Sequence, residues 1–461
     1  MAAECKLNEA SICHLGNCIK KVTGLPSNST SPSDTWLLEF KPGTIYVDVT
    51  GKSIEIPHAF CKIFINPSSL EQWLAKSRAT PDMYALWSSR YLSLQGLEYE
   101  LQFSEFVQNT ILNGKKSPHF IRTFSVGRSC KFTDLNQTLQ KGGISYAHAN
   151  LARNMYYSLQ LAHTRPSISD PTFPSWPKNW NNFQFSFLLT QQIDVKQSKT
   201  FTDWVWTTKT NPEFLGTLFI LLFQICQACY SLYSERACHN DLHSGNIWIT
   251  TRPDSKKNLK YSINSKTYIF PEVTVLARLF DFDRAYAESI GRNPSLDTSL
   301  CPKNGQCNKV IESKDFVKLL CYVVKLLKGN SLQQQIVRGI IIEEGKLTES
   351  LTLFNRLEEM SCHPADEVFN EAAFKEFPSY PVMLDNIYHL WQRYSGKNIP
   401  DDIHVDESFV LSPLYEIGTP DSLFVDYHLG SDRTPPAQVR SAPELDASSM
   451  PRLSPVKTVP L

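Results

Sequence analysis

Residues 237–249, ACHNDLHSGNIWI, decide the fold class of this chain, because this short stretch combines an acid, an amide and a strand-like run. It contains His239-x-Asp241, and Asn246 follows the aspartate by five residues. A carboxylate can orient an acceptor hydroxyl and take its proton, and an amide oxygen can help to hold Mg²⁺ on phosphates. The pattern therefore predicts a loop for phosphoryl transfer, with Asp241 as catalytic base and Asn246 as metal ligand.

The segments on both sides of this loop support the interpretation. Residues 214–230, FLGTLFILLFQICQACY, carry no charge and predict a helix, and residues 246–250, NIWIT, predict a strand. A membrane span is the alternative for the apolar run. A membrane-spanning helix needs ~20 apolar residues, and this run is shorter and contains polar residues, so we expect a buried core helix.

A second acid stands in residues 279–283, LFDFD, at the end of an apolar run that predicts a strand over 275–281. A carboxylate that projects from a strand end into a cleft is a natural ligand of Mg²⁺. Asp281 is therefore the predicted partner of Asn246 in metal binding. The alternative is that Asp281 only caps a turn.

Lys62 lies between apolar neighbours in AFCKIFI, residues 59–65, which predict a strand. A buried ammonium needs a partner, and the helical pattern that follows offers Glu98, Glu100 and Glu105. We favour Glu100, because apolar residues on both sides of it can form one face of a helix. The alternative is an edge strand with Lys62 in solvent.

Asp315 stands near the start of residues 313–329, SKDFVKLLCYVVKLLKG, which predict a helix. One interpretation is that Asp315 lies beneath the loop of His239 and supports that loop by accepting backbone N–H bonds. The other is that Asp315 is an acid at the positive end of a helix dipole.

The order and spacing of these motifs resemble the protein-kinase superfamily over residues 36–400. The wording Asp-Leu-His-x-Gly-Asn at 241–246 is similar to haspin-like kinases, atypical kinases, and aminoglycoside or choline phosphotransferases. The helix start LEYE, residues 97–100, also resembles putative kinases of large DNA viruses such as iridoviruses. The resemblance implies an α+β, bilobal protein-kinase-like fold, with a small β-rich lobe, a mainly helical lobe and a disordered C-terminal tail.

The resemblance also implies roles for single residues, with ATP and Mg²⁺ as cofactors. The predicted nucleotide contacts are Gly43 over the phosphates, Lys62 on the phosphates and paired with Glu100, and residues 189–192, including Gln191 and Gln192, at the adenine. Asp241 is then the catalytic base, Asn246 and Asp281 bind Mg²⁺, and His239 and Asp315 support the catalytic loop.

Four features depart from the superfamily pattern. Around Gly43 the glycine-rich loop G-x-G-x-x-G is absent, and the metal turn is Asp-Phe-Asp instead of Asp-Phe-Gly. No Ala-Pro-Glu follows Asp283 before Asp315, and His243 stands where Ser/Thr kinases usually carry lysine. The part of the large lobe that binds the acceptor is therefore expected to be reduced or different.

The domain prediction follows from these patterns. Residues 1–34 are interpreted as an N-terminal extension and 35–430 as the kinase-like domain. Its small lobe covers about 35–190, with an insertion at about 128–182 that is rich in Pro and Trp, and its large lobe covers about 191–430. Residues 431–461 are rich in proline and predict a disordered tail.

Composition narrows the partners and the compartment. Lys+Arg and Asp+Glu both total 46, so the net charge of zero indicates neither a nucleic-acid nor a membrane partner. Twelve cysteines without a regular framework predict reduced thiols in an intracellular protein, in the cytoplasm, or in the host cytoplasm or virion if the chain is viral. Zinc binding is the alternative for some of these cysteines.

The sequence thus predicts a Ser/Thr protein kinase that transfers the γ-phosphate of ATP to a protein substrate. Two alternatives stay open. His243-Ser244-Gly245 and the missing Ala-Pro-Glu favour a small-molecule phosphotransferase of the same superfamily, and the missing glycines favour a pseudokinase scaffold without activity.

Overall fold

The chain divides into two units, Met1–Tyr415 and Glu416–Leu461. The computed structural model describes, within the first unit, residues 5–7, 12–24, 33–47, 51–76, 81–131, 184–193, 197–252, 254–296, 307–342, 374–397 and 403–411, with a few more near 133–140, 351–358 and 399. The second unit, which holds the predicted disordered tail, lies outside the described residues, and so does most of the predicted insertion at 128–182.

A five-stranded antiparallel sheet carries Lys62. Its strands have the order β2 (Ile19–Gly24), β3 (Ser33–Phe40), β6 (His58–Ile65), β8 (Gln184–Gln191) and β7 (Thr123–Lys131). Side chains alternate between the faces of a strand. The apolar residues of β6 that pack into the core of this sheet include Ala59, Cys61 and Ile63. The strands predicted at 59–65 and 183–190 are confirmed.

The boundary predicted at residue 34 is wrong for this sheet. β2 and the first residues of β3 lie within residues 1–34, and β2 pairs with β3 along its length. Helix α1 (Ile12–Cys18) leads directly into β2, and β1 (Cys5–Lys6) pairs in parallel with β4 (Thr44–Val47), which also pairs with β5 (Ser53–Glu55). Residues 5–6 and 19–24 are therefore part of the sheet structure.

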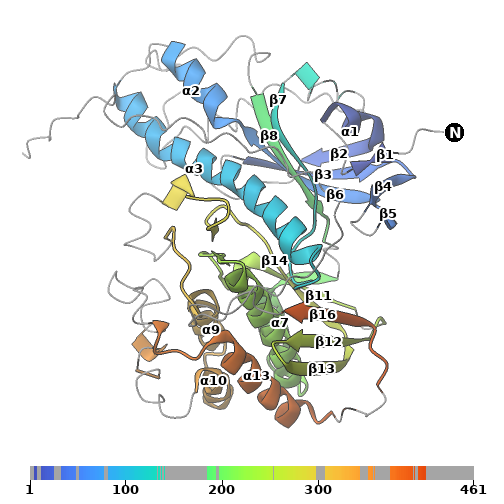
Figure 1. The fold of residues 1–461 in the computed structure, drawn as a ribbon, viewed down its shortest axis with the longest axis vertical. Helices are drawn as coiled ribbons and strands as arrows, with labels where there is room; N and C mark the ends of the chain where they lie inside the picture. The colour runs from blue at the N-terminus through green and yellow to red at the C-terminus, as the bar shows by residue number, and fades with distance from the viewer. Residues whose placement is uncertain are drawn as a thin grey trace, which may run out of the picture. The chain divides into compact units, whose positions relative to one another are not determined.

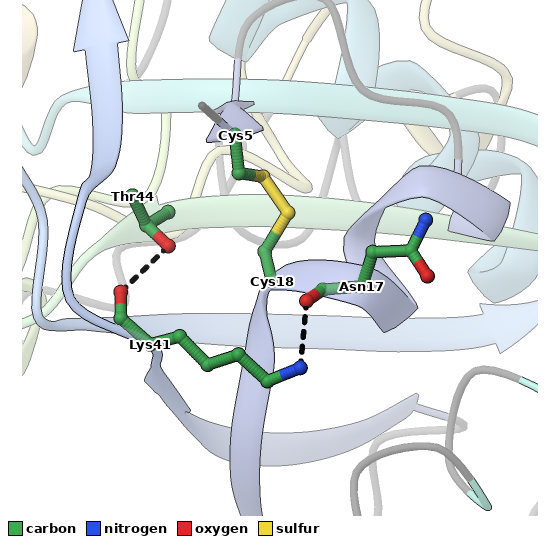
Figure 2. The surroundings of a disulfide bond; sticks show 5 residues. All are labelled: Cys5, Asn17, Cys18, Lys41 and Thr44. Carbon is green, nitrogen blue, oxygen red and sulfur yellow. Dashed lines mark hydrogen bonds between the residues drawn. A yellow bond between two sulfur atoms is a disulfide. The ribbon is translucent and has the colours of Figure 1, made fainter. Parts of the chain in front are cut away.

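A disulfide joins Cys5 of β1 to Cys18 at the end of α1, with their Cα atoms 6.0 Å apart (Figure 2). Next to it, the Lys41 ammonium donates to the Asn17 carbonyl at 2.9 Å, and the Thr44 hydroxyl donates to the Lys41 carbonyl at 2.8 Å. The prediction that the thiols are reduced is therefore wrong for this pair, because β1 and the end of α1 bring two cysteines that are 13 residues apart in sequence together.

Helix α3 (Pro81–Phe106) lies alongside the sheet and continues as a π-helical turn, η2 (Val107–Leu112) (Figure 1). Its buried side chains join two different hydrophobic clusters. Leu97 and Leu101 belong to the cluster under the five-stranded sheet, and Tyr99 and Phe103 belong to the larger cluster formed by the C-terminal half of the domain. α3, which follows the shorter α2 (Pro67–Lys76), therefore contacts both cores.

The larger cluster is built around α7 (Phe214–Ser234), which is buried almost all round. Among the described residues, α7 is the one helix long and apolar enough to cross a membrane, and 89% of its most apolar window is buried inside the protein. α13 (Tyr380–Ser395) lies beside it in Figure 1, and α9 (Lys314–Leu326) also contacts it. The prediction of a buried core helix agrees with this packing.

Two three-stranded sheets and the two-stranded pair of β10 (Ala237–Cys238) and β15 (Tyr286–Ala287) lie in this half of the described chain. In one three-stranded sheet, β11 (Ile247–Thr251) pairs with β14 (Val275–Leu279) and β9 (Ser198–Thr200), which confirms the strands predicted at 246–250 and 275–281. In the other, β12 (Lys257–Ile263) pairs with β13 (Lys266–Val273) and, in parallel, with β16 (Glu407–Leu411). The fold of the described residues is mixed α+β, as predicted.

The remaining elements are short. They are α6 (Phe201–Thr208), β10 (Ala237–Cys238), η4 (Ser244–Asn246), β15 (Tyr286–Ala287), η5 (Pro294–Leu296), α10 (Ser331–Arg338) and η6 (Gly339–Ile341).

Candidate active site

The loop of the predicted catalytic base runs from β10 into β11 and is held from below by α9. The Asp315 carboxylate, buried in the first turn of α9, accepts the backbone N–H of His239 at 2.7 Å and that of Asn240 at 3.0 Å. A carboxylate that accepts backbone N–H groups is a strong, charge-assisted support. The prediction that Asp315 supports this loop is confirmed as a contact.

The same loop is joined to the predicted metal turn. The His239 ring donates from Nε2 to the Phe280 carbonyl at 3.0 Å, and the Phe280 N–H donates to the Asn246 carbonyl at 3.2 Å. The pairing of Ile247 with Leu279 continues this contact into the sheet. Asn246 and Asp281 therefore lie beside each other where β11 begins and β14 ends.

The backbone of the metal turn is unusual at Asp281, whose φ of 67° lies in the left-handed region. Few non-glycine residues adopt this conformation, although aspartate does so more readily than most. The next residue, Phe282, is buried against Phe103 and His239, with ring centroids 5.1 Å and 5.3 Å away. The buried phenyl ring anchors the turn under α3.

The Lys62 ammonium lies between two carboxylates. Its Nζ is 2.7 Å from Glu100 Oε2 and 3.3 Å from Asp281 Oδ1. The preference for Glu100 among the three glutamates is therefore confirmed as an ion pair. Glu98 accepts a hydrogen bond from the Ser186 hydroxyl, and Glu105 pairs with Arg128.

Around Lys62, carboxyl groups outnumber the single ammonium group. Burial lowers the pKa of Lys62, but Glu100 and Asp281 outweigh burial and hold it above its usual value. Lys62 holds the pKa of Asp281 below its usual value, whereas burial raises the pKa of Glu100 to about 7 and that of Asp283 to about 6. One ammonium thus faces several carboxylates, an arrangement that attracts a further cation.

Asn246 and Asp281 suit the ligand preferences of Mg²⁺, because both offer oxygen atoms. The Asn246 amide nitrogen donates to the Asp241 carbonyl at 3.0 Å, so the side-chain oxygen is the atom that remains for a ligand. Within the described residues, no three His, Cys, Asp or Glu side chains form a metal-holding group. Mg²⁺ on a phosphate substrate does not need such a group, because it uses one or two carboxylates, phosphate oxygens and waters.

The position predicted for Gly43, over the phosphates beside Lys62, disagrees with the strand pairing. Lys62 pairs with Thr35 near the start of β3, whereas Gly43 follows the opposite end of that strand. The strand separates the two by more than ~15 Å. Gly24, at the end of β2, lies opposite Trp36 and so much nearer to Lys62. The residues that join β2 to β3, 25–32, lie outside the described part of the chain.

Gln191 and Gln192 lie at the end of β8 and just after it. The Gln191 N–H donates to the Arg122 carbonyl at 2.8 Å, and Gln191 lies opposite Ala59 on β6. Ala59 precedes Lys62 by three residues, which corresponds to ~10 Å along the strand. The structure therefore brings the two glutamines to the same region of the sheet as Lys62, with both side chains partly exposed.

Polar side chains behind the metal turn were not predicted from the sequence. Tyr99, next to Glu100 on α3, bonds through its hydroxyl to the chain after Asp283, and the buried Asn293 bonds back to the turn itself. No local sequence signal marks these residues, because their partners lie on other elements. Asp283 belongs to the stretch 279–283, LFDFD, but no feature of the sequence assigned it a role.

No protein-family model matches this chain, and no curated protein matches its sequence.

Proposed function

We propose that this protein is an ATP- and Mg²⁺-dependent phosphotransferase of the protein-kinase type, which acts on a Ser or Thr hydroxyl of a protein. The observation that carries the proposal is the placement of Lys62 between Glu100 and Asp281, with Asn246 beside Asp281. In protein kinases the lysine–glutamate pair and the metal-binding aspartate must both be in place for transfer.

The architecture supports the proposal at a coarser level. Lys62 stands in the middle strand of a five-stranded sheet with its own hydrophobic cluster, and Asp241, Asn246 and Asp315 belong to the part of the chain around α7 and its larger cluster. A bilobal, kinase-like arrangement has the same division, with a β-rich small lobe and a mainly helical large lobe.

Each residue has a separate task in the proposed reaction. Lys62 positions the phosphates, and Glu100 positions Lys62. Asp241 orients the acceptor hydroxyl and takes its proton. Asn246 and Asp281 hold Mg²⁺, which when bound neutralises charge on the phosphoryl oxygens. His239 and Asp315 keep the loop and the metal turn in register through their backbone contacts.

The first experiment measures Mg²⁺-dependent transfer of labelled γ-phosphate from ATP to a generic protein acceptor and to the protein itself. We expect wild type and the control Asp254→Ala, whose side chain is exposed in a turn, to transfer equally. Asp281→Ala should lose transfer, because it removes a ligand of Mg²⁺. Asp241→Asn should lose transfer but keep its affinity for an ATP analogue, because Asp241 acts on the acceptor.

The results separate the candidate functions. Full activity in Asp241→Asn would contradict the assignment of the catalytic loop. Binding of an ATP analogue without transfer to protein would favour a small-molecule phosphotransferase, the second candidate, which the short chain between Asp283 and Asp315 supports. If the wild type binds no nucleotide, the phosphotransferase proposal fails and a pseudokinase scaffold remains.

We propose an intracellular location, in the cytoplasm, or in the host cytoplasm or virion if the chain is viral, because ATP and Mg²⁺ are supplied there. The Cys5–Cys18 disulfide is the observation that argues against a reducing compartment. Counting the thiols that react with an alkylating reagent in intact cells would decide this point. A Cys5 that does not react, because it is disulfide-bonded, contradicts a location in the reducing cytoplasm.

A further inference from the structure

The Tyr99 hydroxyl makes two hydrogen bonds to the chain that follows the metal turn. It accepts the Ala287 N–H at 3.0 Å and donates to the Gly291 carbonyl at 3.0 Å. Tyr99 is almost fully buried, and burial raises its pKa, so the hydroxyl keeps its proton and can serve as both donor and acceptor. The Tyr99 side chain of α3 thus bridges Ala287 and Gly291, which lie in the segment after the metal turn.

Glu100, the next residue on α3, holds Lys62. The two adjacent side chains therefore reach two different halves of the candidate site: Glu100 contacts the lysine of the sheet, and Tyr99 contacts the segment after Asp283. A shift of this turn of α3 must disturb both contacts together, because a helix is rigid over a single turn.

Neutral side chains order the rest of this segment. The fully buried Asn293 donates to the Asp283 carbonyl at 3.1 Å and to the Ala285 carbonyl at 2.8 Å, and its oxygen accepts from the Ser295 hydroxyl at 2.8 Å. The same Ser295 proton is shared with the Asp283 carbonyl, which lies 3.2 Å from the hydroxyl oxygen. The backbone of the metal turn is therefore held from behind by an amide and a hydroxyl.

Gly96 shows how closely α3 approaches this segment. A Cβ atom at Gly96 would lie 2.9 Å from Ser295 Cβ and 3.2 Å from the Asp283 carbonyl oxygen. The first distance is shorter than real Cβ contacts and the second is tighter than most of them, so a larger residue at Gly96 must push the helix and the segment apart. Glycine here allows contact between the two, in addition to the hydrogen bonds of Tyr99.

We propose that Tyr99 is a positioning residue for the phosphotransfer reaction: its hydroxyl couples α3 to the segment after the metal turn, so that Glu100 and Asp281 are aligned without a phosphate on that segment. The inference rests on the proposed function. Activation loops of protein kinases are commonly ordered by new pairs between arginine and a phosphorylated residue. Here the residue directly before Asp241 is Asn240 and not an arginine. Asn240 is buried and donates to the Cys307 carbonyl, so it provides no cation for a phosphate on that segment.

Tyr99→Phe removes the hydroxyl and keeps the ring, and Tyr388→Phe is the matched control, because it removes a tyrosine hydrogen bond to the Ile269 carbonyl far from the site. Losing one buried hydrogen bond corresponds to about a tenfold change, and Tyr99→Phe removes the two that this hydroxyl makes, so the tenfold effects expected here are lower bounds. We expect Tyr99→Phe to exchange the amide of Ala287 about tenfold faster, to lower kcat about tenfold and to raise the Mg²⁺ concentration for half-maximal activity. The control should change none of the three.

A second variant covers the case in which Tyr99→Phe fails to fold. Gly96→Ala should produce the same exchange and Mg²⁺ phenotype, whereas Gly339→Ala should not, because its nearest contact would be a methyl group at 3.9 Å. Wild type made in bacteria and treated with phosphatase should keep its full kcat.

Two results overturn the inference. One is that Tyr99→Phe and Gly96→Ala show the same amide exchange at Ala287 and the same Mg²⁺ dependence as their control variants. The other is that wild type loses activity after phosphatase treatment. Failure of the proposed function looks different. A wild type that neither binds nor transfers phosphate ends the kinase proposal, and hydrogen exchange alone then still decides whether Tyr99 orders the segment.

Discussion

His119 illustrates how one buried side chain links three elements. It is fully buried in the chain between α3 and β7, its Nδ1 donates to the Ala277 carbonyl of β14 at 3.2 Å, and its Nε2 lies 2.9 Å from the Tyr261 hydroxyl of β12. The neutral ring can donate at one nitrogen and accept at the other. Burial lowers the pKa of His119 to about 3.

This depressed pKa predicts a loss of stability in acid. The unfolded chain takes up a proton on His119 as the pH falls below about 6.5, and the folded chain does not. The contribution of His119 is therefore fully present above pH 6.5 and is lost progressively as the pH falls towards 3. Between pH 6.5 and 5 we expect a loss of about 2 kcal/mol in the free energy of unfolding.

Urea unfolding at both pH values checks this expectation, with His119→Gln as the test variant, because glutamine offers a donor and an acceptor but does not titrate. The variant should lose less stability than wild type over this pH interval. The exposed His404 provides the control His404→Gln, which should behave as wild type. Equal pH dependence in all three proteins would contradict a buried neutral His119.

Single residues of the candidate site were predictable where the residue itself is anomalous. Lys62 lies in an apolar strand, so its ammonium needs an acidic partner, and the helical pattern that follows predicted Glu100 as that partner. Gly43 was wrong for the opposite reason: its distance along the chain from Lys62 looked suitable, but antiparallel pairing carries it to the far end of β3. Tyr99 and Asn293 carried no signal, because a hydroxyl and an amide become informative only once their partners are known.

At the scale of elements, β7 and β8 are joined by a register that leaves no room at Gly127. This residue lies opposite Phe187, and a Cβ atom on it would come within 1.8 Å of the Phe187 ring. Overpacking of this kind costs roughly 1–3 kcal/mol or more, because the ring must leave its rotamer or the strands must separate.

We therefore expect Gly127→Ala to lower the free energy of unfolding by at least ~2 kcal/mol in chemical denaturation. Gly24→Ala is the matched control in the same sheet, because a Cβ atom there meets nothing within 4 Å. It should leave stability within about 0.5 kcal/mol of wild type. If both variants unfold at the same denaturant concentration, the β7–β8 register described here is wrong.

Elements with strong periodicity were predicted, and elements defined by their partners were not. The long apolar run gave α7, and alternating aromatic and β-branched residues gave β6 and β8. The hairpin of β12 and β13 was missed, although its residues alternate, because Asn264 supplies the positive φ at its turn without the usual following glycine. β16 was missed because its partner, β12, is remote in sequence.

At the scale of the whole described domain, the N-terminal residues are tied to the sheet by the Cys5–Cys18 disulfide as well as by strand pairing. Cys5 belongs to β1, which pairs with β4, and Cys18 directly precedes β2, which pairs with β3. Closing a short loop of this kind removes entropy mainly from the unfolded chain, and such bonds typically contribute ~2–4 kcal/mol.

Reduction should therefore lower the stability of the wild type towards that of Cys18→Ser. The measurement is the unfolding midpoint in urea with and without a thiol reductant, and Cys226→Ser, which changes a buried free thiol, controls for effects on other cysteines. Cys307 is also disulfide-bonded, so the reductant can lower the Cys18→Ser midpoint through that bond, and the wild-type midpoint should fall further than the midpoint of Cys18→Ser. An unchanged wild-type midpoint, with alkylation proving that the bond is reduced, would show that strand pairing alone holds these residues.

The parallel pairing of β12 with β16 has a consequence for synthesis on the ribosome. Residues 257–263 leave the ribosome long before residues 407–411. The buried ring of Tyr261 packs against Phe409 of β16 and that of Phe270 against Trp391 of α13, so both rings stay exposed until these elements have been made. The larger core can therefore close only when nearly all of the described chain has emerged. A nascent chain stalled before residue 403 should bind chaperones, whereas one extended well past residue 411 should resist protease.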